Sequence, residues 1–173
     1  MKEKGFNRDK EDDPSGWGDE AYFCESCGKP FRYPLFDVAK EFERTIFQGD
    51  DSPPEIEIIG SEGIGNYCSN VCRDQARNSL LQRENVRATY PGIGPVERCS
   101  RCAAPVDMAK FHLAYVESVL DGEWDRMAVS VLDTAVVAIV CNRCSAPPGR
   151  LIAETDFPVD DLTKVSIADP LSK

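Results

Sequence analysis

The sequence predicts an α+β protein made of two tandem units. Each unit has the order cysteine pair, helix, short β-strands, cysteine pair. The first observation is that the eight cysteines form four close pairs, and the second is that these pairs repeat: the first and third pairs are 75 positions apart, the second and fourth 73. The third is that helix-like and strand-like patterns alternate in the same order between the pairs. The pairs are Cys24/Cys27, Cys68/Cys72, Cys99/Cys102 and Cys141/Cys144.

Each unit is expected to contain a helix after its first cysteine pair. In the first unit the apolar residues recur at intervals of three and four, and Gly49 follows as a stop signal. The second unit has a similar pattern, ending at Gly122. The helical positions are Phe36, Ala39, Phe42 and Ile46 in the first unit, and Met108, Phe111, Tyr115 and Val119 in the second.

Short strands are expected between each helix and the second cysteine pair. β-Favouring runs occur there, "EIEIIG" and "IGNYC" in the first unit, "MAVSVL" and "AVVAIVC" in the second. Directly after Tyr67 the stretch "CSNVCRDQA" changes to a helix-competent pattern. The sequence therefore places Cys68 and Cys72 where a strand meets a helix.

The pattern divides the chain into four segments. Residues 1–20 are acidic and contain Gly and Pro, which predicts a disordered N-terminus. The first unit is expected over 21–90, including its C-terminal helix, and the second over 95–145. Residues 146–173 open with "APPG" and predict an extended acidic tail.

Composition narrows the function classes. The 173 residues include 30 acidic and 20 basic side chains, a net charge of −10. Such a surface repels nucleic acid and anionic membranes and attracts basic proteins. The N-terminus is too polar for a signal peptide, and the apolar run from Ala135 is far too short to span a membrane. We therefore expect a cytoplasmic protein, in which thiols stay reduced and eight cysteines need a role other than disulfides.

Metal binding is the role that fits the spacing. Two cysteines separated by two or three residues can direct both sulfurs at one point, and two such pairs supply the tetrahedral four-thiolate shell that zinc accepts. The prediction is two Zn²⁺ per chain, bound by all eight cysteines. Mononuclear iron is the competing metal, because it uses the same ligands and geometry.

The cysteine corners resemble known zinc-finger modules. "YCSNVCRDQA" resembles the second half of a treble-clef finger, in which a strand delivers one cysteine and a helix carries the next. "FCESCGKPF" resembles the zinc knuckle that opens such fingers, while "RCSRCAAPV" and "VCNRCSAP" resemble knuckles of the zinc-ribbon and treble-clef kind. The resemblance implies zinc-stabilised units, but no particular function.

The repeat favours sequential pairing, in which each unit binds one metal. Two other arrangements use the same cysteines. The inner pairs, Cys68/Cys72 and Cys99/Cys102, are separated by only 26 residues and could share one metal while the outer pairs share another. In a cross-braced arrangement, alternate pairs would share a metal.

No enzymatic activity or small-molecule substrate is predicted. Catalytic zinc keeps an open coordination position, whereas four thiolates close the shell. His112 is the only histidine, and we interpret it as a core or surface residue. No nucleophile–base pair stands out in the sequence.

Two kinds of partner remain open. The acidic surface favours a basic protein, which would make the chain a protein-binding, inhibitory or regulatory module. Residues 73–101 nevertheless carry six arginines and three acidic residues, a net charge of +3. A nucleic-acid-binding regulator is therefore the alternative, and its contact residues would be a helical stripe of Arg73, Arg77, Arg83 and Arg87.

Overall fold

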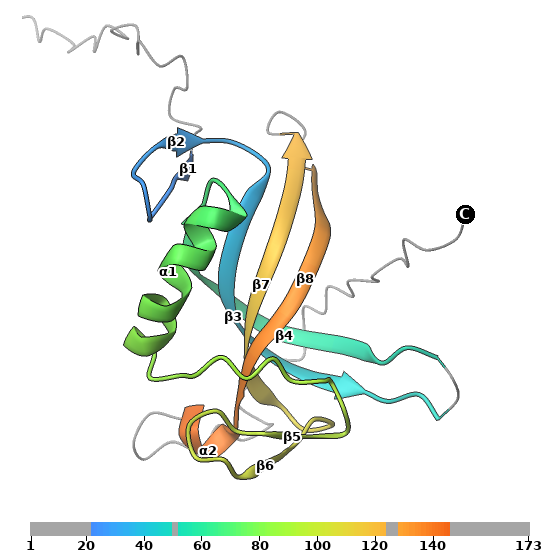
Figure 1. Cartoon of the computed structure of the whole chain (residues 1–173). Coiled ribbons are helices and arrows are strands. Elements are labelled where there is room, and N and C mark those ends of the chain that lie inside the picture. The colour runs from blue at the N-terminus through green and yellow to red at the C-terminus, as the bar shows by residue number, and fades with distance from the viewer. Residues whose placement is uncertain (1–21, 50–51, 124–127, 146–173) are drawn as a thin grey trace, which may run out of the picture.

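A computed structural model describes residues 22–49, 52–123 and 128–145. The segments expected to be flexible, 1–20 and 146–173, lie outside the described residues. The fold is α+β, as predicted, and is dominated by four long strands (Figure 1). Those strands are β3 (Leu35–Ile46), β4 (Glu55–Tyr67), β7 (His112–Glu123) and β8 (Ala128–Val140).

The four strands form one antiparallel sheet in the order β4-β3-β7-β8. The central contact joins the two units: β3 pairs with β7 from Leu35↔Leu120 to Glu43↔His112. Each unit thus contributes one hairpin, and the two hairpins meet edge to edge. The repeat seen in the cysteine spacing appears in the structure as two similar halves of a single sheet.

The helices expected at Phe36–Ile46 and Met108–Val119 are wrong, because these segments lie mainly in strands β3 and β7. The physical reason is burial on both faces. Central strands carry apolar residues on both sides, so their sequences contain helical spacings by coincidence. The two short strands expected in each unit form one long strand instead, β4 in the first unit and β8 in the second. Bulges interrupt the pairing of β4 with β3 and of β8 with β7.

Small elements complete each unit at opposite ends of the sheet (Figure 1). Two-stranded ribbons hold the first cysteine pair of each unit, and helices follow the long hairpins. The ribbons are β1 (Tyr22–Phe23) with β2 (Pro30–Phe31) and β5 (Val96–Arg98) with β6 (Pro105–Asp107). The helices are α1 (Asn70–Arg83) and α2 (Asn142–Ser145).

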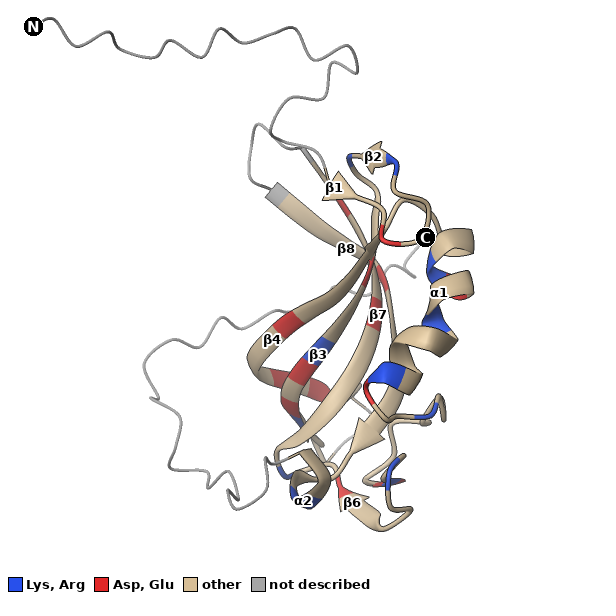
Figure 2. Ribbon diagram, turned by 90° about the vertical axis from the view of Figure 1, so that its left-hand side faces the viewer, with Lys and Arg blue, Asp and Glu red and all other residues tan. Residues whose placement is uncertain are grey.

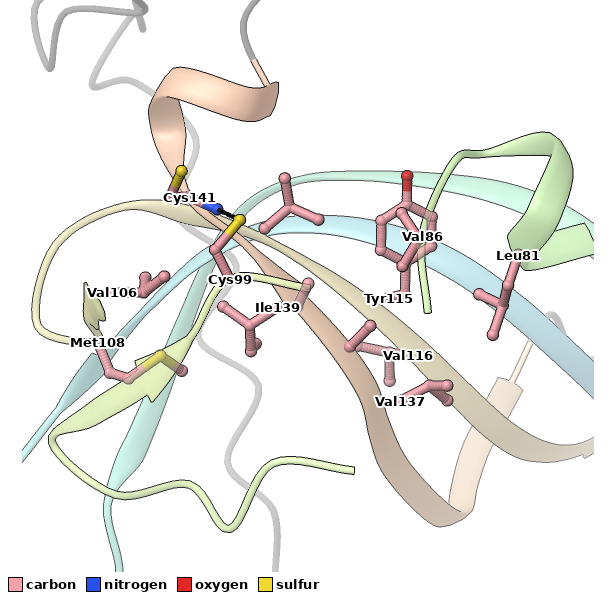
Figure 3. Close-up of a cluster of buried hydrophobic side chains, with 13 residues drawn as sticks. Leu81, Val86, Cys99, Val106, Met108, Tyr115, Val116, Val137, Ile139 and Cys141 are labelled. Atoms are coloured by element: carbon pink, nitrogen blue, oxygen red, sulfur yellow. Dashed lines mark hydrogen bonds between the residues drawn. The ribbon is translucent and has the colours of Figure 1, made fainter. Parts of the chain in front are cut away.

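The core lies in two clusters, one beside each cysteine group. The first contains Tyr67 and Leu80, and packs α1 against β3 and β4. The second surrounds Cys99 and Cys141 and includes Ile139, as Figure 3 shows. Each group of cysteines is therefore continuous with the apolar core of its own end of the sheet.

The lone histidine, His112, is a fully buried residue of β7. Its Nδ1 lies 2.8 Å from the carbonyl oxygen of Lys110, and its Nε2 lies 3.6 Å from the buried carboxylate of Glu43. Glu43 is its direct partner in the β3–β7 pairing. The interpretation of His112 as a core residue agrees with this position, although the expected helix does not.

Candidate metal centres

The structure brings the eight cysteines together in two groups of four, as sequential pairing predicts. One group is Cys24, Cys27, Cys68 and Cys72; the other is Cys99, Cys102, Cys141 and Cys144. Within each group all four sulfur atoms lie within 4.8 Å of one another. The nested and cross-braced arrangements do not occur, because the two groups lie at opposite ends of the sheet (Figure 1).

The spacing of the sulfur atoms fits a tetrahedral metal. Cys68 Sγ lies 3.7 Å from the Sγ atoms of both Cys27 and Cys72, and Cys102 Sγ lies 3.8 Å from Cys141 Sγ. A tetrahedral ion with metal–sulfur bonds of ~2.3 Å separates its ligands by about 3.8 Å. Each group could therefore hold one metal ion.

The first two cysteines of each group lie in equivalent turns. The Gly28 amide donates to Cys24 O at 2.8 Å, and the Ala103 amide donates to Cys99 O at 2.8 Å. Gly28 and Ala103 both adopt positive φ, 71° and 59°. The left-handed residue turns the chain back so that both thiols face the same point, and glycine adopts this conformation more readily than alanine.

The last two cysteines come from a strand end and a helix start. Cys68 directly follows β4, and Cys72 lies in the first turn of α1. Ser69 caps that helix, since its hydroxyl accepts a hydrogen bond from the Cys72 amide at 3.2 Å. In the second unit Cys141 follows β8 and Cys144 lies in the short helix α2.

Backbone amides stabilise one thiolate in each group. Burial by itself would raise the pKa of Cys24, but hydrogen bonds from backbone groups of Cys68, Cys27 and Ser26 outweigh it and lower the pKa to about 6. The equivalent Cys99 behaves in the same way, with a pKa of about 6.

The Cys141 amide lies 3.4 Å from Cys99 Sγ, the contact drawn in Figure 3. Thiolates are the metal-binding form of cysteine, so these amides prepare the groups for a cation.

The other shifted thiols favour the neutral form. Burial raises the pKa of Cys68 and of Cys144 to about 12, and the neighbouring thiols contribute in the same direction. Several thiolates this close repel one another. A bound cation removes that repulsion, so the clustering of four thiols is chemically consistent with metal ligation.

The arginine stripe is not a single exposed helix face. The helix α1 ends at Arg83, and Asn85 follows with a left-handed φ of 54°, so Arg87 lies beyond the helix. Arg73 Nε lies 3.3 Å from Glu117 Oε2, and Arg77 binds the same buried carboxylate. Only Arg83 and Arg87 of the four are exposed.

No local pattern in the sequence indicates Glu117 or Arg101 as partners of these segments. Arg101 donates to the carbonyl oxygens of Cys144 at 2.6 Å and of Glu84 at 2.8 Å. It therefore links the second cysteine group to the end of α1. Such contacts join residues far apart in sequence, and no local pattern signals them.

No helix among the described residues is long and apolar enough to cross a membrane. Comparison with known proteins finds no family model, no curated protein and no solved structure that matches the chain.

Proposed function

We propose that this chain is a non-enzymatic zinc-binding module that recognises a basic protein partner through an acidic hairpin. The observation that carries the proposal is the assembly of all eight cysteines into two four-thiol groups. Zinc is the metal that most commonly occupies such closed sites, where it stabilises the fold. With four thiolates on each ion, no coordination position remains for a substrate.

The order of elements supports a treble-clef-like architecture for the first unit. A ribbon carrying Cys24 and Cys27 precedes a long hairpin, and a helix begins beside the second cysteine pair. The second unit has the same order with a helix of four residues. In this proposal the zinc ions fix the two ends of the sheet, and recognition belongs to the surfaces between them.

The β3–β4 hairpin is the surface that fits a basic partner. Residues 35–67 contain eight acidic and two basic side chains. Figure 2 shows acidic residues along β3 and β4, while lysines and arginines predominate along α1. Within the hairpin, Lys40 pairs with Glu62 and Arg44 with Glu57, so the hairpin retains a negative charge. Charge complementarity favours a basic protein there.

Affinity capture from the native host, with zinc retained, tests this proposal. The variant Glu55→Gln/Glu57→Gln/Glu62→Gln removes three charges from β4, whereas Glu25→Gln/Asp121→Asn/Asp133→Asn removes three elsewhere. A basic protein retained by wild type and by the second variant, but lost with the first, is the expected result. Equal retention by both variants would contradict the acidic hairpin as the docking surface. Binding of the purified partner should also weaken as salt rises.

A nucleic-acid-binding regulator that uses Arg73, Arg77, Arg83 and Arg87 is the second candidate. Arg73 and Arg77 are engaged by Glu117, so they have little capacity left for phosphate. Among the four, only the exposed Arg83 and Arg87 favour this candidate.

A further inference from the structure

Contacts of Arg101 and of strand β8 bring four parts of the chain together at one end of the sheet. The Arg101 guanidinium donates to Glu84 O, at the end of α1, and to Cys144 O, in α2. The linker between α1 and β5 lies against β8, because the Thr89 amide donates to Val137 O at 2.8 Å. The second cysteine turn contacts the same strand, since the Ser100 amide donates to Ile139 O at 2.8 Å. The end of α1, the linker, the second cysteine turn and α2 are therefore neighbours.

Each of these segments carries exposed arginine next to the Arg101 contacts. Arg83 and Arg87 flank Glu84, Arg98 precedes the cysteine turn, and Arg143 adjoins Cys144. We call Arg83, Arg87, Arg98, Arg101 and Arg143 the arginine cluster. Figure 2 shows basic residues on α1, on the loops that follow it and on α2.

The positive charge of the arginine cluster is largely uncompensated. Within the described residues, none of the five arginines forms an ion pair, in contrast to Arg73 and Arg77. The nearby Glu84 is shared by Lys40 at 3.7 Å and the Tyr115 hydroxyl at 3.2 Å. The described residues carry 12 basic and 15 acidic side chains, so most of the net charge of −10 lies outside them. The surface around the arginine cluster therefore repels an anion less strongly than the net charge of the whole chain suggests.

An exposed aromatic ring lies on the same linker. Tyr90 is 55% exposed, and its amide donates to Val137 O at 3.0 Å, beside the Thr89 contact. Its backbone has a left-handed φ of 46°. An exposed aromatic ring on a backbone held to β8 by hydrogen bonds, three residues after Arg87, resembles the stacking platforms used for unpaired bases.

We propose that the arginine cluster and Tyr90 form a binding surface for single-stranded nucleic acid. Arginine stays charged and pairs well with phosphate oxygens, so the cluster would follow the phosphodiester chain while a base stacks on Tyr90. A duplex fits less well, since the outward side of α1 carries Asp74, Gln75 and Asn78 rather than a basic stripe for the major groove. This surface is separate from the acidic hairpin and does not depend on the partner proposed there.

Fluorescence anisotropy of the full zinc-loaded chain tests the proposal. The probes are labelled 20-nucleotide oligo(dT) and oligo(U), a duplex of the same length, and a 20-residue polyglutamate peptide. We expect wild type to bind one or both single strands, with RNA and DNA distinguished by the two arms, and to bind the duplex and the peptide at least tenfold more weakly. Equal or tighter binding of the duplex or polyglutamate would overturn the assignment, as would no binding of either strand at low salt.

Two variants of the surface and one control variant locate the binding site. Arg83→Gln/Arg87→Gln/Arg143→Gln should weaken binding of the single strand at least tenfold and reduce the salt dependence, log Kd against log[salt], by about 2, since each lost phosphate contact contributes about 0.7. Lys29→Gln/Arg32→Gln/Lys110→Gln makes the same change in charge elsewhere and should alter Kd less than threefold. Tyr90→Leu should weaken binding about fivefold or more without changing the salt dependence. Equal losses in the two triple variants would overturn the proposal, with circular dichroism and zinc content confirming that both remain folded.

Discussion

Glu117 on β7 binds Arg77 on α1 through both of its carboxylate oxygens. Arg77 Nη2 lies 2.8 Å from Oε2, and Arg77 Nε contacts Oε1. Glu117 belongs to the second unit and Arg77 to the first. This ion pair therefore holds α1 of the first unit against β7 of the second. The hydrogen bonds that Arg77 donates to Glu117 raise the pKa of Arg77, which keeps the guanidinium charged.

Replacing Glu117 with glutamine should destabilise the protein by about 2 to 4 kcal/mol, because both Arg73 and Arg77 lose their buried charged partner and keep only the exposed Asp74. Urea unfolding of zinc-loaded protein measures the loss. Arg83→Gln is the control, since that exposed arginine has no ion pair among the described residues and should change stability by less than about 0.5 kcal/mol. A similar loss of stability in both variants would contradict the stabilising role of the Glu117–Arg77 ion pair.

Metal removal should unfold the chain. Each closed four-thiolate zinc site can contribute on the order of 10 kcal/mol to folding at neutral pH. We expect two zinc ions per chain by elemental analysis of fresh protein, and loss of the far-UV circular dichroism signal of the sheet after a strong chelator. Iron would instead make the oxidised protein red. Fewer than two metal ions per chain, or a fold that survives chelation, would refute the prediction.

A double cysteine variant tests which residues share a metal. Cys24→Ser/Cys72→Ser disables a single group in the structure, so the protein should keep one zinc per chain. In a nested or cross-braced arrangement, the same two substitutions would damage both sites and leave none. Cys24→Ser/Cys102→Ser is the matched control, which should lose both ions. Zinc content of the purified variants gives the answer.

The two cysteine turns should respond oppositely to a change at their left-handed residue. Ala103→Gly relieves the strain of a positive φ and should stabilise the second metal group by about 1 kcal/mol. Gly28→Ala introduces that strain in the first group and should destabilise it by a similar amount. No atom lies within 4 Å of the position a Cβ would take at Gly28, so the effect there is conformational. Thermal unfolding with saturating zinc measures both.

The free energy of unfolding should contain a contribution that decreases as the pH rises from about 4.5 to 7. Burial, together with the charge of Glu43, raises the pKa of Glu41 to about 7, and burial raises that of Asp37 to about 6. A carboxyl whose pKa is higher in the folded state stabilises the fold below its unfolded pKa, and this contribution is lost as pH rises through the folded value.

Glu41→Gln should therefore gain stability relative to wild type as pH increases over this range. Urea unfolding of both proteins at several pH values, with zinc present, gives the difference. A constant difference would show that Glu41 titrates normally.

The sequence alone indicated which cysteines could share a metal and that their spacing repeats along the chain. Cysteine pairs two or three residues apart converge through local turns, so Cys24 with Cys27 and Cys99 with Cys102 are recognisable without a fold. The helix after Cys68 was predictable for the same reason, since Ser69 caps it locally.

Tertiary structure decided the conformation of the long segments between the cysteines and the roles of the arginines. β3 and β7 are central strands buried on both faces, so their apolar residues also occur at helical spacings, and only pairing between the units selects the strand. Arg77 is not fully exposed as predicted, because it binds Glu117, which lies 40 residues away in the sequence. Arg83 kept its exposure because it lies where α1 ends. Local chemistry fixes what two nearby residues can do, whereas the partner of a long charged side chain depends on which distant strand the fold places beside it.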